Sequence, residues 1–102
     1  MNYTQKRALY VEMGLICFYA GHTDEASFYF NCVLESGLDD EIEFQAMFFL
    51  SQVLYDRNAC STALKYATLL EQKLSDDKDS AFYALACMQN YIINERIRSF
   101  II

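Results

Sequence analysis

The sequence predicts an all-α protein with a single domain over residues 1–102. Proline is absent and glycine occurs only three times, which favours long helices over the many tight turns of an all-β domain. Apolar residues make up 54% of the chain and aromatic residues 16%, so the chain has the apolar surface that disordered segments lack. Short polar breaks divide the apolar residues into five helical segments.

The first two segments form a pair. Thr4 is expected to cap the first helix, which ends near Ala20. Thr23 is expected to cap the second, where acidic residues in the first turn interact favourably with the helix dipole. Gly37 is a natural residue to end that helix.

Three more helices are expected, one beginning at Asp39 or Asp40, one over about 61–74, and one beginning near Asp79 or Ser80. Residues 95–102 either extend the last helix or form a short sixth one. The first and third helices are apolar around almost their whole circumference, and such helices need cover on more than one side.

Small residues recur in a pattern similar to that of the 34-residue tetratricopeptide unit. Ala26 fits the small position of a second helix, and Gly14 then fits the small position of the first. A second copy anchored on Ala63 lies 37 residues later and places Ser51 opposite it, so about three extra residues are expected in the loop between the two copies. A third copy is a first helix alone, with Cys87 at this position. This pattern predicts tetratricopeptide-like antiparallel hairpins, about two and a half repeats, unless the small residues are ordinary helical filler.

In stacked repeats the first helices line a concave surface that receives a peptide or helix. The expected lining is apolar, contains no Lys or Arg, and suits the apolar face of an amphipathic helix. An apolar stripe at helical spacing can instead be core. Because no segment is left to cover this stripe, we expect an obligate partner. The positions are Val11, Leu15, Phe18 and Tyr19, then Phe48, Gln52 and Tyr55, then Ala84, Met88, Tyr91 and Ile92.

The charge and the motifs of the sequence argue against several classes of function. The formal net charge of −6 argues against nucleic acid as a partner. No apolar run is long enough for a membrane span and no signal peptide is present, so a cytoplasmic location is expected. Four cysteines without a C-x-x-C pair and one histidine, His22, argue for reduced, buried thiols and no metal or other cofactor. No catalytic motif is present, so no enzyme activity is expected.

Three segments resemble the small tetratricopeptide co-chaperones of the needle subunits of bacterial type III secretion systems. They are Val11-Glu12-Met13-Gly14-Leu15-Ile16, Gly21-His22-Thr23-Asp24-Glu25-Ala26 and Phe82-Tyr83-Ala84-Leu85-Ala86-Cys87, and the resemblance spans about residues 8–90. It implies a bacterial cytoplasmic complex in which the apolar groove holds the C-terminal amphipathic helix of the needle subunit and prevents premature polymerisation. A second, smaller helical-hairpin chaperone would pack against this protein.

Two alternatives remain open at this point. The chain could be a structural tetratricopeptide adaptor, built permanently into a larger assembly or a homodimer. It could also be a monomeric helical domain without a binding groove. The first alternative predicts one stable species in solution, whereas a needle co-chaperone is expected to need its partners for solubility.

Overall fold

The computed structural model describes residues 1–101, and the regular structure there is entirely α-helical. The five expected helices are all present, and residues 95–101 continue the fifth helix. Ile102 lies outside the described residues. The helices are α1 (Tyr3–Tyr19), α2 (Thr23–Leu34), α3 (Glu41–Asp56), α4 (Cys60–Lys73) and α5 (Ala81–Ile101).

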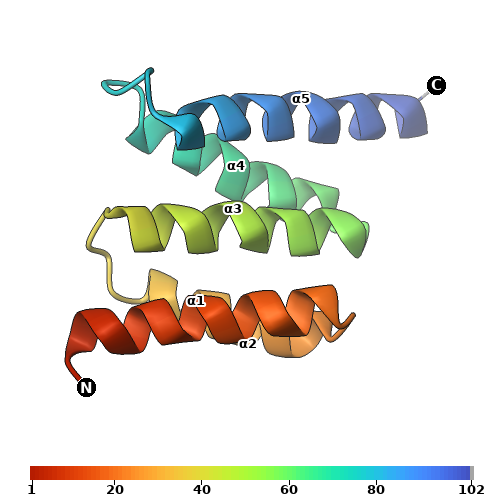
Figure 1. The fold of residues 1–102 in the computed structure, drawn as a ribbon. Helices are drawn as coiled ribbons and strands as arrows, with labels where there is room; N and C mark the ends of the chain where they lie inside the picture. The colour runs from red at the N-terminus through yellow and green to blue at the C-terminus, as the bar shows by residue number, and fades with distance from the viewer. Residues whose placement is uncertain (102) are drawn as a thin grey trace.

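The helices form two layers (Figure 1). Helices α1, α3 and α5 run parallel to one another in one layer, and α2 and α4 lie behind them. Each helix packs against the next in the chain, and α3 also contacts both α1 and α5. The Cα atoms extend over 51 × 34 × 18 Å, so the molecule is a slab about two helices thick. The outer face of each layer is therefore not covered by another element of the described chain.

The helix ends differ in part from the expected ones. Asn2 rather than Thr4 caps α1: its side chain accepts a hydrogen bond from the Gln5 amide (2.8 Å), and the Gln5 side chain accepts one from the Asn2 amide (3.0 Å). This reciprocal pair is a capping box and fixes the start of the helix. His22 rather than Thr23 is the N-cap of α2, without a side-chain bond.

The other ends lie close to the expected residues. Asp40 caps α3 as expected, because its Oδ1 accepts a hydrogen bond from the Glu43 amide at 3.0 Å. Helix α2 ends at Leu34 rather than continuing to Gly37, which lies in the following loop with φ of +61°. A positive φ suits glycine, so this residue shapes the loop rather than ending the helix.

Small residues do lie where paired helices cross. A Cβ atom added to Gly14 would lie 2.6 Å from Cε1 of Phe30, so only glycine lets α1 approach α2 this closely. Ala26 and Ala63 are fully buried, and the Ser51 hydroxyl donates a hydrogen bond to the Ala63 carbonyl at 2.9 Å across the α3–α4 crossing. The hairpin arrangement predicted from these residues is confirmed.

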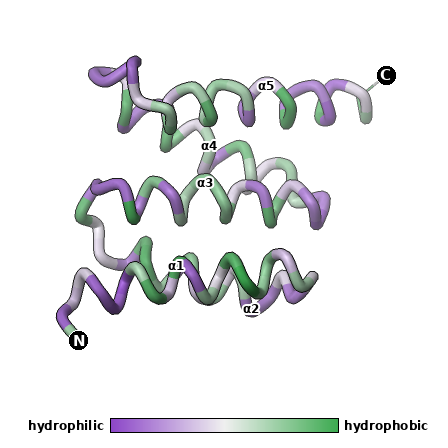
Figure 2. Tube along the Cα trace, viewed as in Figure 1, coloured by the Kyte–Doolittle hydropathy of each residue, from purple (hydrophilic) through white to green (hydrophobic). Residues whose placement is uncertain are grey.

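The largest group of buried apolar residues joins the first three helices. It contains Val11 from α1, Ala26, Phe30 and Val33 from α2, and Ala46, Leu50 and Val53 from α3. Smaller groups bind α4 and α5 to α3. Figure 2 shows hydrophobic stretches along α1, α3 and α5, whereas the loop before α5 is hydrophilic.

A partly buried ion pair fixes the start of α1 on the start of α3. The Arg7 side chain is only 2% exposed, and its two terminal nitrogens donate to the two carboxylate oxygens of Asp40 at 2.7 and 2.8 Å. These hydrogen bonds from Arg7 lower the pKa of Asp40 to about 2. Bidentate pairs of this kind combine charge attraction with a fixed geometry.

The cysteines are free thiols, as expected, but only one is fully buried. Cys60 is 7% exposed, whereas Cys17, Cys32 and Cys87 are half-buried. Burial, together with the hydrogen bond to Glu71, raises the pKa of the Cys87 thiol, whose Sγ lies 3.3 Å from a Glu71 oxygen. Cys87 therefore contacts the preceding helix α4.

Candidate protein-binding face

The predicted binding positions all belong to α1, α3 and α5. We call the side of this layer that faces away from α2 and α4 the first-helix face (Figure 1). The most exposed predicted positions are Tyr19 (75%), Tyr91 (68%) and Met88 (50%). Ala84 and Ile92 are also exposed. The half-buried positions are Leu15, Phe18, Phe48, Gln52 and Tyr55.

Val11 is not on this face. Its side chain is 2% exposed and belongs to the core shared by α1, α2 and α3. The reason is the packing of α3 on α1, which covers the side of the first helix that contains Val11. The expectation that Val11 lines a binding groove is therefore wrong, and its role is to hold the first hairpin on α3.

Aromatic side chains form the part of the face between α1 and α3. The Phe18 ring lies 6.2 Å from the Phe49 ring, and Phe48 meets Phe49 edge to face at 5.3 Å. Phe49 in turn stacks on the fully buried Phe30 at 6.1 Å. Phe18 and Phe48 are thus anchored at one edge in the core and remain half open at the other.

The part of the face between α3 and α5 is more polar. Gln52 donates a hydrogen bond to Asp56 (2.9 Å) and accepts one from Gln89 of α5 (3.2 Å). The Arg96 guanidinium lies 3.8 Å above the Tyr55 ring and donates to the Tyr55 carbonyl at 2.9 Å. Gln52 and Tyr55 therefore hold α5 on α3 as well as contributing to the surface.

A second apolar surface was not among the predicted positions. Leu9 (43% exposed) and Ile16 (67% exposed) lie on α1 outside the predicted set. The repeat interval of 37 residues matches them to Ala46 and Val53, which are fully buried in the core that α2 and α3 share. The repeat could have indicated these positions in the sequence. In α3 the matching residues pack against the preceding helix α2, whereas no described helix precedes α1.

The total accessible surface of this chain is that of an ordinary monomer of its mass. Its accessible surface is 6106 Å², close to the value of about 5,900 Å² that scaling predicts for a monomer of this mass. Exposed large apolar side chains instead belong mainly to α1 and α5, and α3 between them has none. Helices α2 and α4 expose only Phe28 and Leu69, whereas α1 and α5 expose Tyr3, Leu9, Ile16, Tyr19, Met88, Tyr91, Ile92, Phe100 and Ile101.

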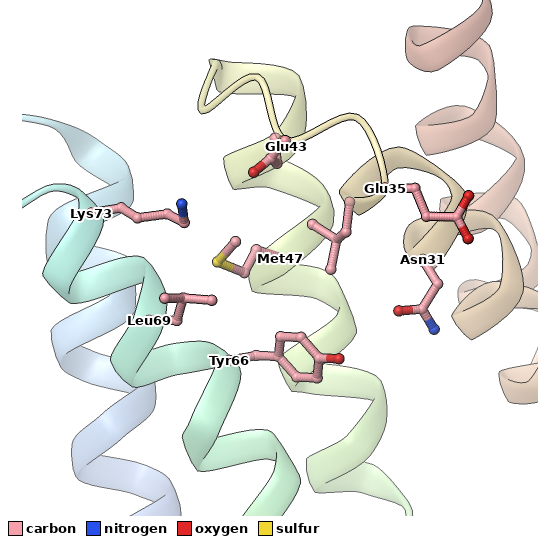
Figure 3. Close-up of a pocket in the computed structure, with 9 residues that line it drawn as sticks. Asn31, Glu35, Glu43, Met47, Tyr66, Leu69 and Lys73 are labelled. Carbon is pink, nitrogen blue, oxygen red and sulfur yellow. The ribbon is translucent and has the colours of Figure 1, made fainter.

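The hollow drawn in Figure 3 opens between α2, α3 and α4 and has a volume of about 490 Å³. Its wall combines apolar groups such as Met47 and Leu69 with Glu35 and Lys73. The Lys73 ammonium pairs with Asp39, so the lysine is already engaged within the chain. This hollow lies away from the first-helix face and includes none of the predicted binding positions.

Residues 1–101 contain neither of two other kinds of site. No helix in this range combines the length and apolar character needed to cross a bilayer. No group of three or more His, Cys, Asp or Glu side chains in the same range is placed to hold a metal ion.

Comparisons with family models, curated protein sequences and solved structures find no match to this chain.

Proposed function

We propose that this protein is a chaperone or adaptor that binds an amphipathic helix of another protein on its first-helix face. The observation that carries the proposal is the exposure of Tyr19, Met88 and Tyr91 on that face, beside the half-buried Phe18 and Phe48. Aromatic residues and methionine are enriched at protein interfaces, and methionine adapts its shape to a partner. A helix that presents an apolar stripe is the partner that such a face fits best.

The two-layer fold supports this proposal. Because the slab is 18 Å thick, the described chain has no third layer to cover α1, α3 and α5. The core residues beneath the face, including Phe30 and Leu50, are already buried. The exposed side chains are therefore not required for the core and are free to contact a partner.

As the specific client we propose the needle subunit of a bacterial type III secretion system. The resemblance of residues 11–16, 21–26 and 82–87 to the needle co-chaperones supports this choice. Binding would keep the needle subunit from polymerising prematurely in the cytoplasm. A small helical-hairpin co-chaperone would complete the complex.

A structural adaptor subunit of a larger assembly or a homodimer is the second candidate. The exposure of Leu9 and Ile16 favours it, because these residues lie outside the predicted client-binding positions. A permanent assembly would cover them in every state of the protein. A client-specific chaperone would cover the first-helix face only when its client is bound.

Substitutions on exposed positions test the helix-binding proposal without disturbing the core. Met88→Asp and Tyr91→Asp place a charge on the face and should each weaken binding of a peptide from the last helix of the needle subunit by about tenfold or more. Fluorescence anisotropy measures the affinity, and circular dichroism checks that helicity is retained. Phe28→Asp is the matched control, since Phe28 has a similar exposure (62%) but lies on α2.

Three outcomes separate the candidates. Loss of binding in the two α5 variants but not in Phe28→Asp supports the first-helix face. Equal affinity in all variants contradicts it. If the isolated protein is a stable homodimer by light scattering and Ile16→Asp makes it monomeric without affecting peptide binding, Ile16 belongs to a self-assembly contact and the adaptor alternative gains support.

A further inference from the structure

We infer that the client helix is basic, with Lys or Arg residues beside its apolar stripe. This inference rests on the proposed function and specifies the chemistry of the partner. It follows from the charges along α3, the central helix of the first-helix face.

One stripe of α3 begins and ends with a carboxylate. Residues that recur every three or four positions share one side of a helix. Glu41, Gln45, Phe48, Gln52 and Asp56 follow this spacing, and all five are exposed or half-buried. The two acidic residues are 15 positions apart, which corresponds to about 22 Å along the helix. An apolar and amide surface is thus bounded by a negative charge at each end.

These carboxylates have no cationic partner among residues 1–101. Neither Glu41 nor Asp56 takes part in a salt bridge there, and Asp56 accepts its hydrogen bond from the neutral Gln52 amide. They therefore differ from Asp40, whose charge is compensated by the buried Arg7.

Two of the three arginines toward the C-terminal end of α3 and on α5 are paired with carboxylates, and the third, Arg96, has neutral partners. Arg57 pairs with Asp24 at 2.8 Å, and Arg98 pairs with Glu95 at 3.1 Å. Arg96 donates to the Tyr55 carbonyl and to the Asn58 side chain, at 2.9 and 3.2 Å. No Lys or Arg is among the predicted binding positions on the face, and the two carboxylates of the α3 stripe outnumber the single cation beside it, Arg96 over the Tyr55 ring.

A bound helix would place its flanking side chains near Glu41 and Asp56. Opposite charges at the rim of an apolar contact speed association and select the partner, and like charges repel the wrong one. Lys and Arg are suited to this arrangement, because their aliphatic stems lie on apolar surface while the charged ends reach the carboxylates. The net charge of −6 attracts the same partner at longer range.

Three synthetic peptides of about five helical turns test the inference. They share one leucine stripe and carry Lys, Gln or Glu at the flanking positions, and anisotropy measures their affinities. At low ionic strength the Lys peptide should bind about threefold to tenfold more tightly than the Gln peptide, and the Glu peptide should bind more weakly than both. The differences should shrink at about 1 M salt, where the Debye length is about 3 Å.

The double variant Glu41→Gln/Asp56→Asn keeps the side-chain sizes and removes the two charges. It should reduce the preference for the Lys peptide over the Gln peptide to less than about twofold, because the rim pairs are lost. Glu35→Gln, which removes an exposed carboxylate at the end of α2, is the matched control and should leave the preference unchanged.

The outcomes distinguish this inference from the proposed function beneath it. Equal affinity of the three peptides, or tighter binding of the Glu peptide, overturns the inference while the first-helix face remains a helix-binding surface. Absence of binding by all three peptides overturns the proposed function as well. A homodimer that Met88→Asp dissociates identifies a second copy of this chain as the occupant and also overturns the inference.

Discussion

The junction between α2 and α3 and the junction between α4 and α5 occupy equivalent places in the repeat, yet they are built from different residues. Large apolar side chains fill the first: Phe30 and Val33 of α2 meet Leu50 and Val53 of α3, and all four are at most 1% exposed. The second combines small and large residues: Ala63 and Ala67 of α4 lie in one cluster with Ile93 of α5, and Leu70 of α4 lies in another with Ala86 of α5.

Polar groups enter both junctions, but in different places. At the first, the buried Glu43 carboxylate accepts hydrogen bonds from the Leu38 amide (2.8 Å) and the Ser36 hydroxyl (3.3 Å) of the loop between α2 and α3.

At the second, polar side chains join the two helices themselves. The Asn90 amide nitrogen donates to a Glu71 carboxylate oxygen at 2.7 Å and to the Ala67 carbonyl at 3.4 Å. The Thr68 hydroxyl donates to the Asn90 carbonyl oxygen at 3.2 Å. Burial of apolar area contributes more per residue than such hydrogen bonds, whose net contribution is about 1 kcal/mol each. We therefore expect α5 to be held less strongly than the first three helices.

The largest expected effect comes from removing the centre of the first junction. Phe30→Ala deletes a fully buried ring that packs on Phe49 and against Gly14, and should lower the free energy of unfolding by about 3–5 kcal/mol. Urea denaturation followed by circular dichroism measures this change. For a chain of this size, that loss is a large part of the total stability.

Phe28→Ala is the control on the same helix. The Phe28 ring is 62% exposed, so its removal should change the unfolding free energy by less than about 0.5 kcal/mol. Equal effects at the two positions would contradict the assignment of the α2–α3 junction as the stable part of the molecule.

Part of this structure could be predicted from the sequence. The five helices and the small residues at Gly14, Ala26 and Ala63 were predictable, because they depend on local spacing and on the helix crossing that each repeat requires. The burial of Arg7 was not, since its partner Asp40 is 33 residues away. The repeat interval of 37 residues gave an indirect indication of this burial, because it matches Arg7 to Phe44, an apolar residue of the next repeat.

The polar α4–α5 junction has a similar signal. An interval of 36 residues matches Asn90 to Leu54, so a buried amide stands where the preceding repeat has leucine. The position of Val11 could not be read from the repeat in this way. Its register matches Phe48, which is half-buried, and only the contact between α1 and α3 decides that Val11 is covered.

An intermediate effect is expected at the polar junction. Asn90→Ala leaves an oxygen of Glu71 without its donor and removes the acceptor of Thr68, which should lower the unfolding free energy by about 1–2 kcal/mol. Hydrogen exchange with mass spectrometry should show faster exchange in α5 with little change in α1–α3. Uniformly faster exchange along the chain would show instead that α5 does not open separately.

The smallest expected effect concerns pH and the ion pair beside the first junction. Arg7 holds the pKa of Asp40 at about 2, below the ordinary value of 3.8, so the pair stabilises the fold above that ordinary value. The stabilisation should be lost as pH falls from about 4 to about 2. Because the Asp40 side chain is 40% exposed, solvent screening limits the expected loss to roughly 1 kcal/mol.

Urea midpoints measured across this pH range test the effect. Arg7→Met removes the largest cause of the lowered Asp40 pKa, whereas the hydrogen bond from the Glu43 amide remains. The fall in stability between pH of about 4 and about 2 should therefore be smaller by up to that roughly 1 kcal/mol. Asp24→Asn removes the exposed Arg57–Asp24 pair and serves as the control that keeps the wild-type pH dependence. If Arg7→Met loses stability with acid as steeply as the unchanged protein, other carboxylates cause the acid sensitivity and the ion pair contributes only geometry to the contact between α1 and α3.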